Sequence, residues 1–263
     1  MYGSLWSVDR LVKRDMDGIE DIRGNYLRVL EQIDSAARSA GRNPATVRLL
    51  VVTKGHPVET VHQAVAAGIR LLGENYVEEA LEKMQTLASQ AIGSPGELEW
   101  HMIGHLQSRK ARLVCQHFAC LHSLDSLKLA ERLDRFAAEL GRKLPVLLEC
   151  NVSGEQTKFG YPVWREDTWH EFVGEFSRLL ELPHLQVRGL MTMAPFFDQP
   201  EPARPYFQRL RRFQAFLVKS LPLSDWAELS MGMSGDFTVA VQEGATLVRV
   251  GTAILGARDL RID

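Results

Sequence analysis

The chain alternates between short apolar runs and longer segments in which apolar residues recur at helical spacing. The apolar runs are continuous, as is typical of strands buried on both faces of a parallel sheet. Strands are predicted at Val47–Lys54, Arg70–Glu74, Glu99–Ile103, Cys120–Leu124, Pro145–Val152, Val187–Met193, Glu228–Met231 and Thr246–Val250. Helices are predicted between them at Val58–Ala67, Val77–Gln90, Ser108–His117, Ser126–Leu140, Glu166–Leu180, Tyr206–Lys219 and Gly235–Glu243.

This alternation in a chain of 263 residues predicts an α/β fold with a single closed (β/α)8 TIM barrel. The alternative is an open, doubly wound sheet, but no predicted strand is followed by a G-x-G-x-x-G turn. An extra helix is predicted at Asp17–Ala40, where Gly41 and Pro44 end it. Residues 1–15 show no clear periodicity, so we expect a disordered or loosely docked N-terminal tail before a barrel domain over residues 16–263.

Charge and cysteine content narrow the range of partners. The net charge of −2 and the absence of a long basic run argue against nucleic-acid binding. No apolar run reaches membrane-spanning length, and charged residues such as Asp9 and Arg10 interrupt any signal-peptide core. The chain has only three cysteines, which fits a reducing compartment better than a disulfide framework. We therefore expect a cytoplasmic protein without membrane contact.

Lys54 is the first candidate for chemistry. It ends the apolar run Leu49–Val52, and sites in this type of barrel lie at the carboxyl ends of the strands. A partly desolvated lysine has a depressed pKa and more of the neutral amine that attacks carbonyl groups. The alternative is an ordinary solvated lysine at a strand end, and position alone favours that alternative.

Two loops near the end of the chain predict an anion site. Ser234 lies in the glycine-rich segment Ser230–Phe237, just before a predicted helix, where backbone N–H groups favour an anion. Gly251 and Thr252 follow the last predicted strand, and Gly251 allows close backbone approach. Loops after the seventh and eighth strands recur as phosphate sites in such barrels. Ordinary turn glycines and capping serines are the alternative for each loop alone.

Three further polar positions permit two interpretations each. Arg249 lies inside the last predicted strand, where its guanidinium needs either a carboxylate partner or a cofactor atom to contact. Asn75 ends the second predicted strand and is either a ligand-orienting amide or a helix N-cap. His101 and His105 lie at or near a strand end, where hydrogen-bonded structure is commoner than catalysis.

Cysteine and histidine residues also cluster at Cys115, His117, Cys120 and His122. The cluster spans a predicted helix end, a turn and a strand start, and it lacks the spacing of a zinc site. We therefore predict no metal site.

Taken together, these motifs resemble the YggS/PROSC (PLPBP) family of pyridoxal-phosphate homeostasis proteins. The resemblance covers nearly everything from Asp17 to the end of the chain, and the joint occurrence of the motifs is specific. The matching segments are Gly41-Arg42, LLVVTK at 49–54, GENYVEEA at 73–80, WHMIGHLQSRKARLV at 100–114, VLLECNVSGEQTKFG at 146–160, RGLMTMAP at 188–195 and SMGMSGDFTVAVQEGATLVRVGTAILG at 230–256.

The resemblance implies the fold-type III, alanine racemase-like barrel and binding of pyridoxal 5′-phosphate (PLP). It implies that Lys54 forms the Schiff base and that Arg249 faces the pyridine nitrogen. It also implies that Ser234, Gly251 and Thr252 hold the phosphate, and that Asn75 lies near the ring. His105 and Arg109 depart from the family pattern, in which proline and asparagine are more frequent, so contacts at the rim of the site are in doubt.

Three functional hypotheses follow. The first is a monomeric protein that buffers PLP and delivers it to PLP-dependent apoenzymes, with indirect effects on amino-acid and keto-acid pools. It is preferred because no second acid/base group opposite Lys54 is evident and no C-terminal β-domain is expected, so we expect no catalytic turnover. The second is a single-domain PLP-dependent racemase or lyase. The third is a cofactor-free Schiff-base aldolase, in which the phosphate loops would hold a sugar phosphate.

Overall fold

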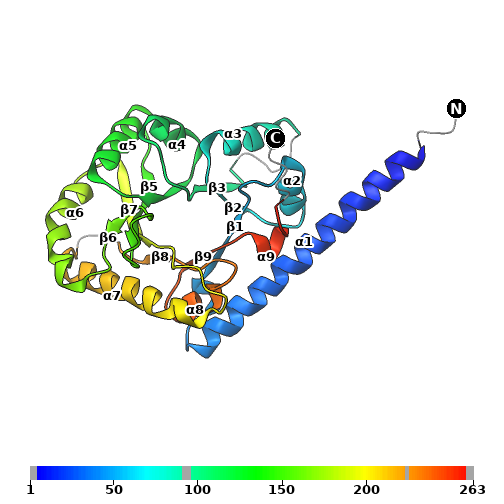
Figure 1. The fold of residues 1–263 in the computed structure, drawn as a ribbon. Helices are drawn as coiled ribbons and strands as arrows, with labels where there is room; N and C mark the ends of the chain where they lie inside the picture. The colour runs from blue at the N-terminus through cyan, green and yellow to red at the C-terminus, as the bar shows by residue number, and fades with distance from the viewer. Residues whose placement is uncertain (1–4, 91–95, 223–224, 259–263) are drawn as a thin grey trace.

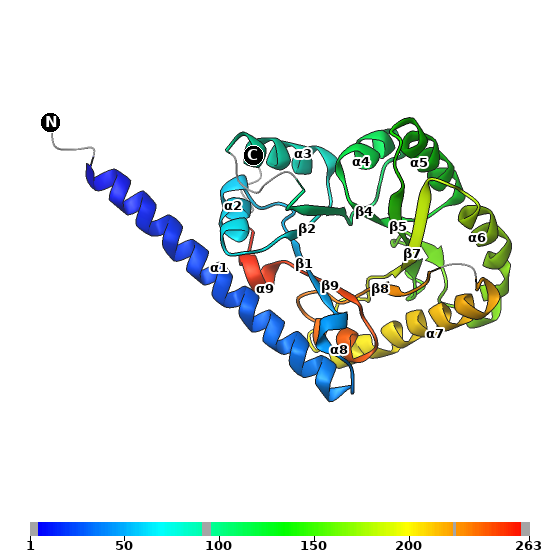
Figure 2. The same ribbon diagram turned by 180° about the vertical axis from the view of Figure 1, so that it is seen from behind.

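The structure is a closed parallel barrel surrounded by helices (Figures 1 and 2). The computed structural model describes residues 5–90, 96–222 and 225–258, with side chains from residue 16 onward except that of residue 17. The strands follow the order β4-β3-β2-β1-β9-β8-β7-β5, and pairing of β4 with β5 closes the barrel. Their bounds are β1 Arg48–Val52, β2 Leu71–Glu74, β3 Glu99–Met102, β4 Cys120–Leu124, β5 Leu144–Asn151, β7 Leu185–Met191, β8 Glu228–Ser230 and β9 Leu247–Val250. The predicted barrel is therefore confirmed.

Each predicted helix is present, with shifted ends. The helices are α2 Val58–Ala66, α3 Val77–Ser89, α4 Ala111–His117, α5 Leu127–Glu139, α6 Val173–Leu180, α7 Arg204–Ser220 and α8 Phe237–Gln242. Two of them begin as 3-10 turns, over Ser108–Lys110 and Glu166–Phe172, and further 3-10 turns cover Pro44–Thr46 and Glu201–Ala203. The sequence prediction missed the two-residue strand β6 Tyr161–Pro162 and the helix α9 Thr252–Leu255 because both are too short to show periodicity.

Helix α1 spans Leu5–Ser39 and thus begins at Leu5 rather than at Asp17. From Ile22 onward its buried positions face the barrel, and the helix packs against α2, α8 and α9. The first turns of α1 extend beyond the barrel (Figure 1). An apolar stripe marks the helix face that packs against a core, so these turns show no such stripe and the sequence pattern did not reveal them as helix. The division into a tail and a barrel domain remains a prediction, and residues 1–4 lie outside the described part of the chain. Among the described residues, no helix is both long and apolar enough to cross a membrane.

The strand β1 shows how the barrel is filled. Leu49 and Val51 join the large core between strands and helices, whereas Leu50 and Val52 join a separate cluster inside the barrel. This division follows from the two-residue period of a strand. A side chain at Gly73 would have its Cβ 2.2 Å from Leu50 Cδ2, so glycine at this position allows Leu50 to fill the interior.

The barrel interior is not wholly apolar. Besides the cluster around Leu50 and a second one formed by Cys120, Leu147 and Met191, it contains buried polar side chains on the inward-facing positions of the strands. These buried polar residues include His101, His122, Glu149, Ser230 and Arg249. Because buried polar groups need hydrogen-bond partners, the contacts of these side chains show which of their donors and acceptors remain free to bind a ligand.

Candidate functional site

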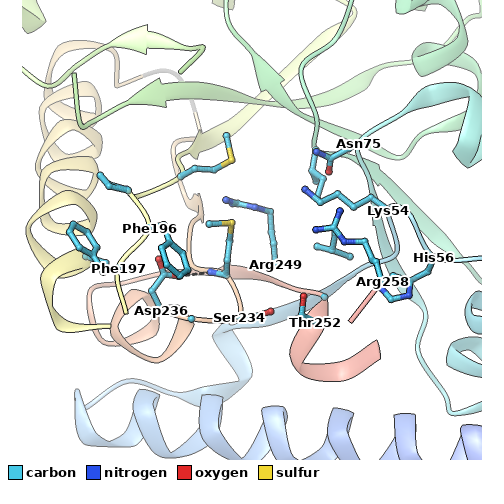
Figure 3. A pocket seen from close by; sticks show the side chains of 18 of the residues that line it. Lys54, His56, Asn75, Phe196, Phe197, Ser234, Asp236, Arg249, Thr252 and Arg258 are labelled. Atoms are coloured by element: carbon cyan, nitrogen blue, oxygen red, sulfur yellow. Dashed lines mark hydrogen bonds between the residues drawn. The ribbon is translucent and has the colours of Figure 1, made fainter. Parts of the chain in front are cut away.

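A cavity of about 360 Å³ opens at the carboxyl ends of the strands, beside β1, β2, β7, β8 and β9 (Figure 3). It lies where the barrel fold predicts a site. The structure brings together at this cavity all the residues selected from the sequence as cofactor-binding candidates: Lys54, Asn75, Ser234, Arg249, Gly251 and Thr252.

Lys54 follows β1 and is half-buried. Burial lowers the pKa of its ammonium group below the ordinary value, and the charges of Arg258 and Arg249 lower it further. A lowered pKa increases the fraction of neutral amine, the form that attacks a carbonyl carbon. Lys54 is thus partly desolvated and is not a fully solvated charge at a strand end.

The backbone on both sides of Lys54 is held by a buried ion-pair cluster. Lys83 Nζ donates to the Thr53 carbonyl oxygen at 2.7 Å, to Glu74 Oε1 at 2.7 Å and to Glu79 Oε1 at 2.6 Å. Glu79 Oε1 also accepts from the N–H of Gly55 at 2.6 Å. The residues before and after Lys54 are therefore both tied to helix α3.

Sequence reasoning missed Lys83 because a lysine in a helix is usually solvated. The available signal was weak: Glu79 and Lys83 are four residues apart, which places them on one helix face. Lys83 is only 5% exposed, so the pair faces the barrel rather than the solvent.

Arg249 lies on β9 with its side chain buried in the barrel and directed at the cavity (Figure 3). Its Nη1 donates to Ser230 Oγ at 2.7 Å and its Nη2 donates to the Thr192 carbonyl oxygen at 2.8 Å. No carboxylate of the described residues forms an ion pair with it, so the salt-bridge interpretation was wrong. Burial lowers the pKa of Arg249 to about 10, which leaves the guanidinium charged at neutral pH.

Asn75 lies at the other side of the cavity, beside Lys54 (Figure 3). Its side-chain oxygen is buried and has no hydrogen-bond partner among the described residues. The N-cap of α3 is Tyr76, so the interpretation of Asn75 as a helix cap was wrong. Gly104 allows the backbone of Asn75 to approach closely, because a Cβ on Gly104 would lie 2.4 Å from the Asn75 carbonyl oxygen. The Asn75 amide is therefore available to a ligand.

The two predicted anion loops both reach the cavity. Ser234 lies in the turn before α8, which begins at Phe237 and not at Gly235 as predicted. The turn is closed by Asp236, whose carboxylate accepts from the N–H of Met233 at 2.6 Å. Gly251 packs closely against the carboxyl end of β1: a Cβ added to Gly251 would lie 3.0 Å from the Val52 carbonyl oxygen.

Several lining residues were not selected from the sequence. Arg258 adds a third cation to those of Lys54 and Arg249, and it lies close to Gly55. Phe196, which is 87% exposed, forms part of the outer wall. A cavity with three cations and the carboxylate of Asp236 is suited to an anionic ligand.

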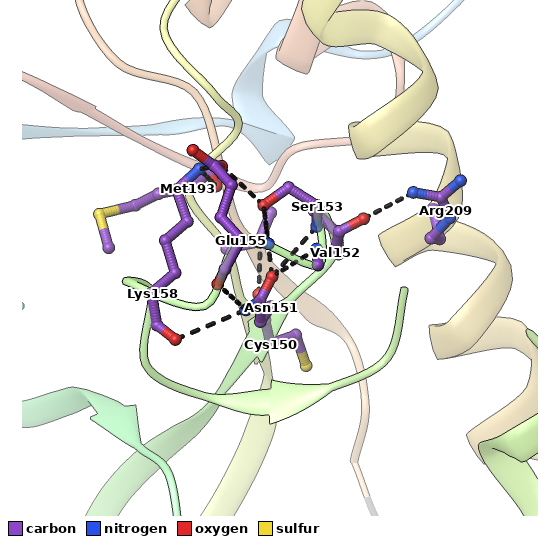
Figure 4. Close-up of polar contacts among 10 residues, drawn as sticks. Cys150, Asn151, Val152, Ser153, Glu155, Lys158, Met193 and Arg209 are labelled. Atoms are coloured by element: carbon purple, nitrogen blue, oxygen red, sulfur yellow. Dashed lines mark hydrogen bonds and ion pairs between the residues drawn. The ribbon is translucent and has the colours of Figure 1, made fainter. Parts of the chain in front are cut away.

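Asn151, at the end of β5, is not among the residues that line this cavity. Asn151 holds its own loop together: its amide donates to the Glu155 carbonyl oxygen at 2.9 Å and accepts from the N–H of Gly154 at 2.9 Å (Figure 4). Lys158 connects this loop to the cavity wall, since its Nζ donates to the Met193 carbonyl oxygen at 3.2 Å and contacts Glu155 at 2.5 Å.

His105 and Arg109, the departures from the family pattern, also lie away from the cavity. His105 Nδ1 is 3.3 Å from Asp125, and its ring stacks on Phe159 with 3.7 Å between ring centres. Arg109 donates to Gln107 at 3.0 Å.

Two members of the cysteine and histidine cluster noted in the sequence, Cys120 and His122, come together with His101, which was not part of that cluster. Ligand atoms of His101, Cys120 and His122 lie within 4.8 Å of one another. All ring nitrogens of both histidines already have hydrogen-bond partners. Burial raises the pKa of the Cys120 thiol, which opposes the thiolate form that binds metals.

Comparison with known proteins places this geometry in a family. The family model described as alanine racemase, N-terminal domain, matches residues 28–259. The pyridoxal phosphate homeostasis protein of Vibrio alginolyticus is 40% identical over 242 residues, which cover 92% of this chain and 99% of the relative. The pyridoxal phosphate homeostasis protein of Escherichia coli K12 is 39% identical over 246 residues, which cover 92% of this chain and 98% of the relative.

Solved structures of similar proteins support the same family and fold. PipY of Synechococcus elongatus with PLP bound is similar at a TM-score of 0.73 and 39% identity, covering 87% of this chain and 100% of PipY. Alanine racemase of Clostridium difficile shares the fold alone, at a TM-score of 0.63 and 17% identity, covering 89% of this chain and 56% of the racemase. The chain therefore belongs to the pyridoxal phosphate homeostasis family, within the alanine racemase N-terminal domain fold.

Proposed function

We propose that this protein binds PLP as a Schiff base on Lys54 and acts in intracellular PLP homeostasis. Its relatives carry that name at about 40% identity, and the solved PipY structure holds PLP. When bound, PLP supplies an electron-withdrawing ring and an aldehyde carbon that combines with amines.

The observation that carries this proposal is the pairing of Lys54 and Arg249 at one cavity. Arg249 is a buried cation without a carboxylate partner in the described part of the chain, and an unpaired buried charge is costly. A ligand that accepts a hydrogen bond at this position would compensate the cost. The pyridine nitrogen of PLP is such an acceptor, and Lys54 would hold the aldehyde end of the same molecule.

The other lining residues fit the remaining groups of PLP. The Ser234 hydroxyl, with the backbone of Gly251 and the hydroxyl of Thr252, would bind the phosphate, and Arg258 would add positive charge. The unpaired side-chain oxygen of Asn75 would orient a group near the ring. Because an arginine does not readily release its proton, Arg249 would leave the ring nitrogen unprotonated and the ring a weaker electron sink.

In this account the protein stores PLP and hands it to PLP-dependent apoenzymes, with indirect effects on amino-acid and keto-acid pools. It acts as a monomer in the cytoplasm and without sustained turnover. The alternative, a single-domain racemase or lyase, requires exchange of the Cα proton of an amino acid. Incubation of the purified protein with amino acids in deuterium oxide distinguishes the two, because repeated exchange that is lost in Lys54→Ala would favour the enzyme.

The visible absorbance spectrum tests PLP binding itself. Wild-type protein supplied with PLP should develop the absorbance band of a Schiff base, and Lys54→Ala should not. Lys158→Ala is the matched control, since Lys158 lies on a neighbouring loop outside the described lining of the cavity. Absence of the band from the wild type would overturn the proposal.

A further inference from the structure

A continuous line of hydrogen bonds crosses the barrel interior beneath the cavity. Arg249 Nη1 lies 2.7 Å from Ser230 Oγ, and Ser230 Oγ lies 3.0 Å from His122 Nδ1. His122 Nε2 lies 2.8 Å from His101 Nδ1, and His101 Nε2 lies 2.8 Å from Glu99 Oε1. All but Glu99 are buried, and the line joins β9 and β8 to β4 and β3, with His122 and Ser230 lying 108 positions apart in the chain.

The donors and acceptors along this line have one consistent direction. The guanidinium of Arg249 has only donors, so the Ser230 oxygen accepts from it. The Ser230 hydroxyl hydrogen then points to His122 Nδ1, which is the other partner of Ser230 Oγ in the described structure. With Nδ1 accepting, a neutral His122 donates from Nε2 to His101 Nδ1. His101 then donates from Nε2 to the Glu99 carboxylate.

The pKa shifts of His122 and Glu99 agree with this direction. Burial lowers the pKa of His122 well below its ordinary value, so the ring is neutral. The hydrogen bond from His101 lowers the pKa of Glu99 to about 2, so the carboxylate is charged and can only accept. Glu99 starts β3 at the amino end of the barrel and is paired with Arg48 at 2.8 Å. The line therefore runs from a cation at the cavity to an anion at the opposite end of the barrel.

We propose that Ser230, His122 and His101 are positioning residues for Arg249, which they hold directed at the cavity through hydrogen bonds that all point toward Glu99. Each bond polarises the next, so the Glu99 carboxylate strengthens the Ser230 oxygen as an acceptor. We call the hydrogen-bonded line from Arg249 through Ser230, His122 and His101 to Glu99 the relay. Within the described structure, Ser230 and Thr192 use two of the five N–H groups of the Arg249 guanidinium, which leaves the others for a ligand. The consequence for a bound cofactor rests on the function proposed above.

A packing role alone does not account for this arrangement. Polar side chains are not required to fill a barrel interior, and the neighbouring interior positions Leu50, Leu147 and Leu247 are apolar. If the relay served only to stabilise the fold, replacing one of its residues would change the stability of the protein and nothing else. A positioning relay also affects the electronic state of whatever Arg249 contacts, and the two roles are therefore separable by spectroscopy.

The direction of the relay is tested first in protein without PLP. Histidine-selective ¹⁵N labelling with NMR reports which ring nitrogen carries the proton, and His101→Gln and His122→Gln variants assign the signals. We expect neutral rings protonated at Nε2 for both residues. A proton on His122 Nδ1, or a doubly protonated ring at either position, would overturn the proposal.

The effect on the ligand is tested with Ser230→Ala, Ser230→Thr and Ser123→Ala. Ser123 is the matched control, because it is also a fully buried strand serine, and its hydroxyl donates to the Gly104 carbonyl oxygen at 2.6 Å instead. Loss of a hydrogen bond to a charged group predicts a PLP dissociation constant about tenfold higher in Ser230→Ala, together with a shifted visible band. Ser230→Thr, which keeps the hydroxyl, should restore both values, and Ser123→Ala should match the wild type.

Equal effects of Ser230→Ala and Ser123→Ala would contradict the relay while leaving PLP binding intact. Failure of the wild type to bind PLP would instead refute the proposed function. The NMR measurement on the ligand-free protein would then still decide whether the relay exists.

Discussion

The ammonium group of Lys83 lies 2.7 Å from the carbonyl oxygen of Thr53, the residue that precedes Lys54. The same ammonium contacts two carboxylates, and one of them accepts the N–H of the residue that follows Lys54. A long, flexible lysine side chain can be aimed only if its own backbone is fixed. The buried cluster of Lys83, Glu74 and Glu79 thus supplies the fixed base from which Lys54 reaches the cavity.

Replacement of Lys83 tests this cluster. Lys83→Met removes the cation and leaves the fully buried Glu74 without its charge partner. Breaking a buried pair in this way costs about 3–5 kcal/mol of unfolding free energy. Urea denaturation measures the loss. Lys110→Met is the control, because Lys110 pairs with the exposed Glu78 and should cost no more than about 1 kcal/mol. Equal losses in the two variants would contradict the role of the cluster.

Stability should depend on pH through Glu149. Burial, and then the charge of Asp125, raise the pKa of Glu149 to about 7 in the folded protein. Between the unfolded pKa of about 4.3 and this value, the folded state keeps a proton that the unfolded state has lost, so stability falls as the pH rises. The full effect amounts to about 4 kcal/mol and is complete above the folded pKa.

Glu149→Gln keeps the shape of the side chain and removes the titration. Relative to this variant, the wild type should therefore lose stability between about pH 4 and about pH 7 in urea denaturation. Parallel pH profiles of the wild type and Glu149→Gln would show that Glu149 is ionised in the folded protein throughout.

Arg249 should contribute to ligand binding more than to folding. Arg249→Met removes a buried cation that has no carboxylate partner in the described structure, so the unfolding free energy of the ligand-free protein should change by no more than about 1 kcal/mol. PLP affinity should fall at least about tenfold, because a hydrogen bond to a charged group is lost. Fluorescence titration and urea denaturation measure the two quantities.

Arg42→Met provides the opposite pattern. Arg42 donates to the carbonyl oxygens of Val241 and Ala245 and does not line the described cavity. Its replacement should lower stability and leave PLP affinity unchanged. If Arg249→Met binds PLP with the affinity of the wild type, Arg249 does not contribute to PLP binding.

The sequence was sufficient to predict the barrel and the position of the cavity, because both depend on periodicity and on strand ends. The inward and outward alternation of Leu49–Val52 is visible in the residues themselves. The interpretation of Asn75 as a helix cap failed because side-chain capping depends on local geometry that a motif does not fix. The roles of Lys83, His122 and Ser230 were not predicted, because they arise from contacts between residues that are not neighbours in the chain.

The attachment of PLP to Lys54 is the central claim and can be tested by chemical trapping. Reduction of the PLP-loaded protein with borohydride converts a Schiff base into a stable secondary amine, and peptide mass spectrometry then locates it. We predict one modified lysine, Lys54, and no modification after Lys54→Ala. A pyridoxyl group on another lysine of the wild type, with Lys54 unmodified, would contradict the account.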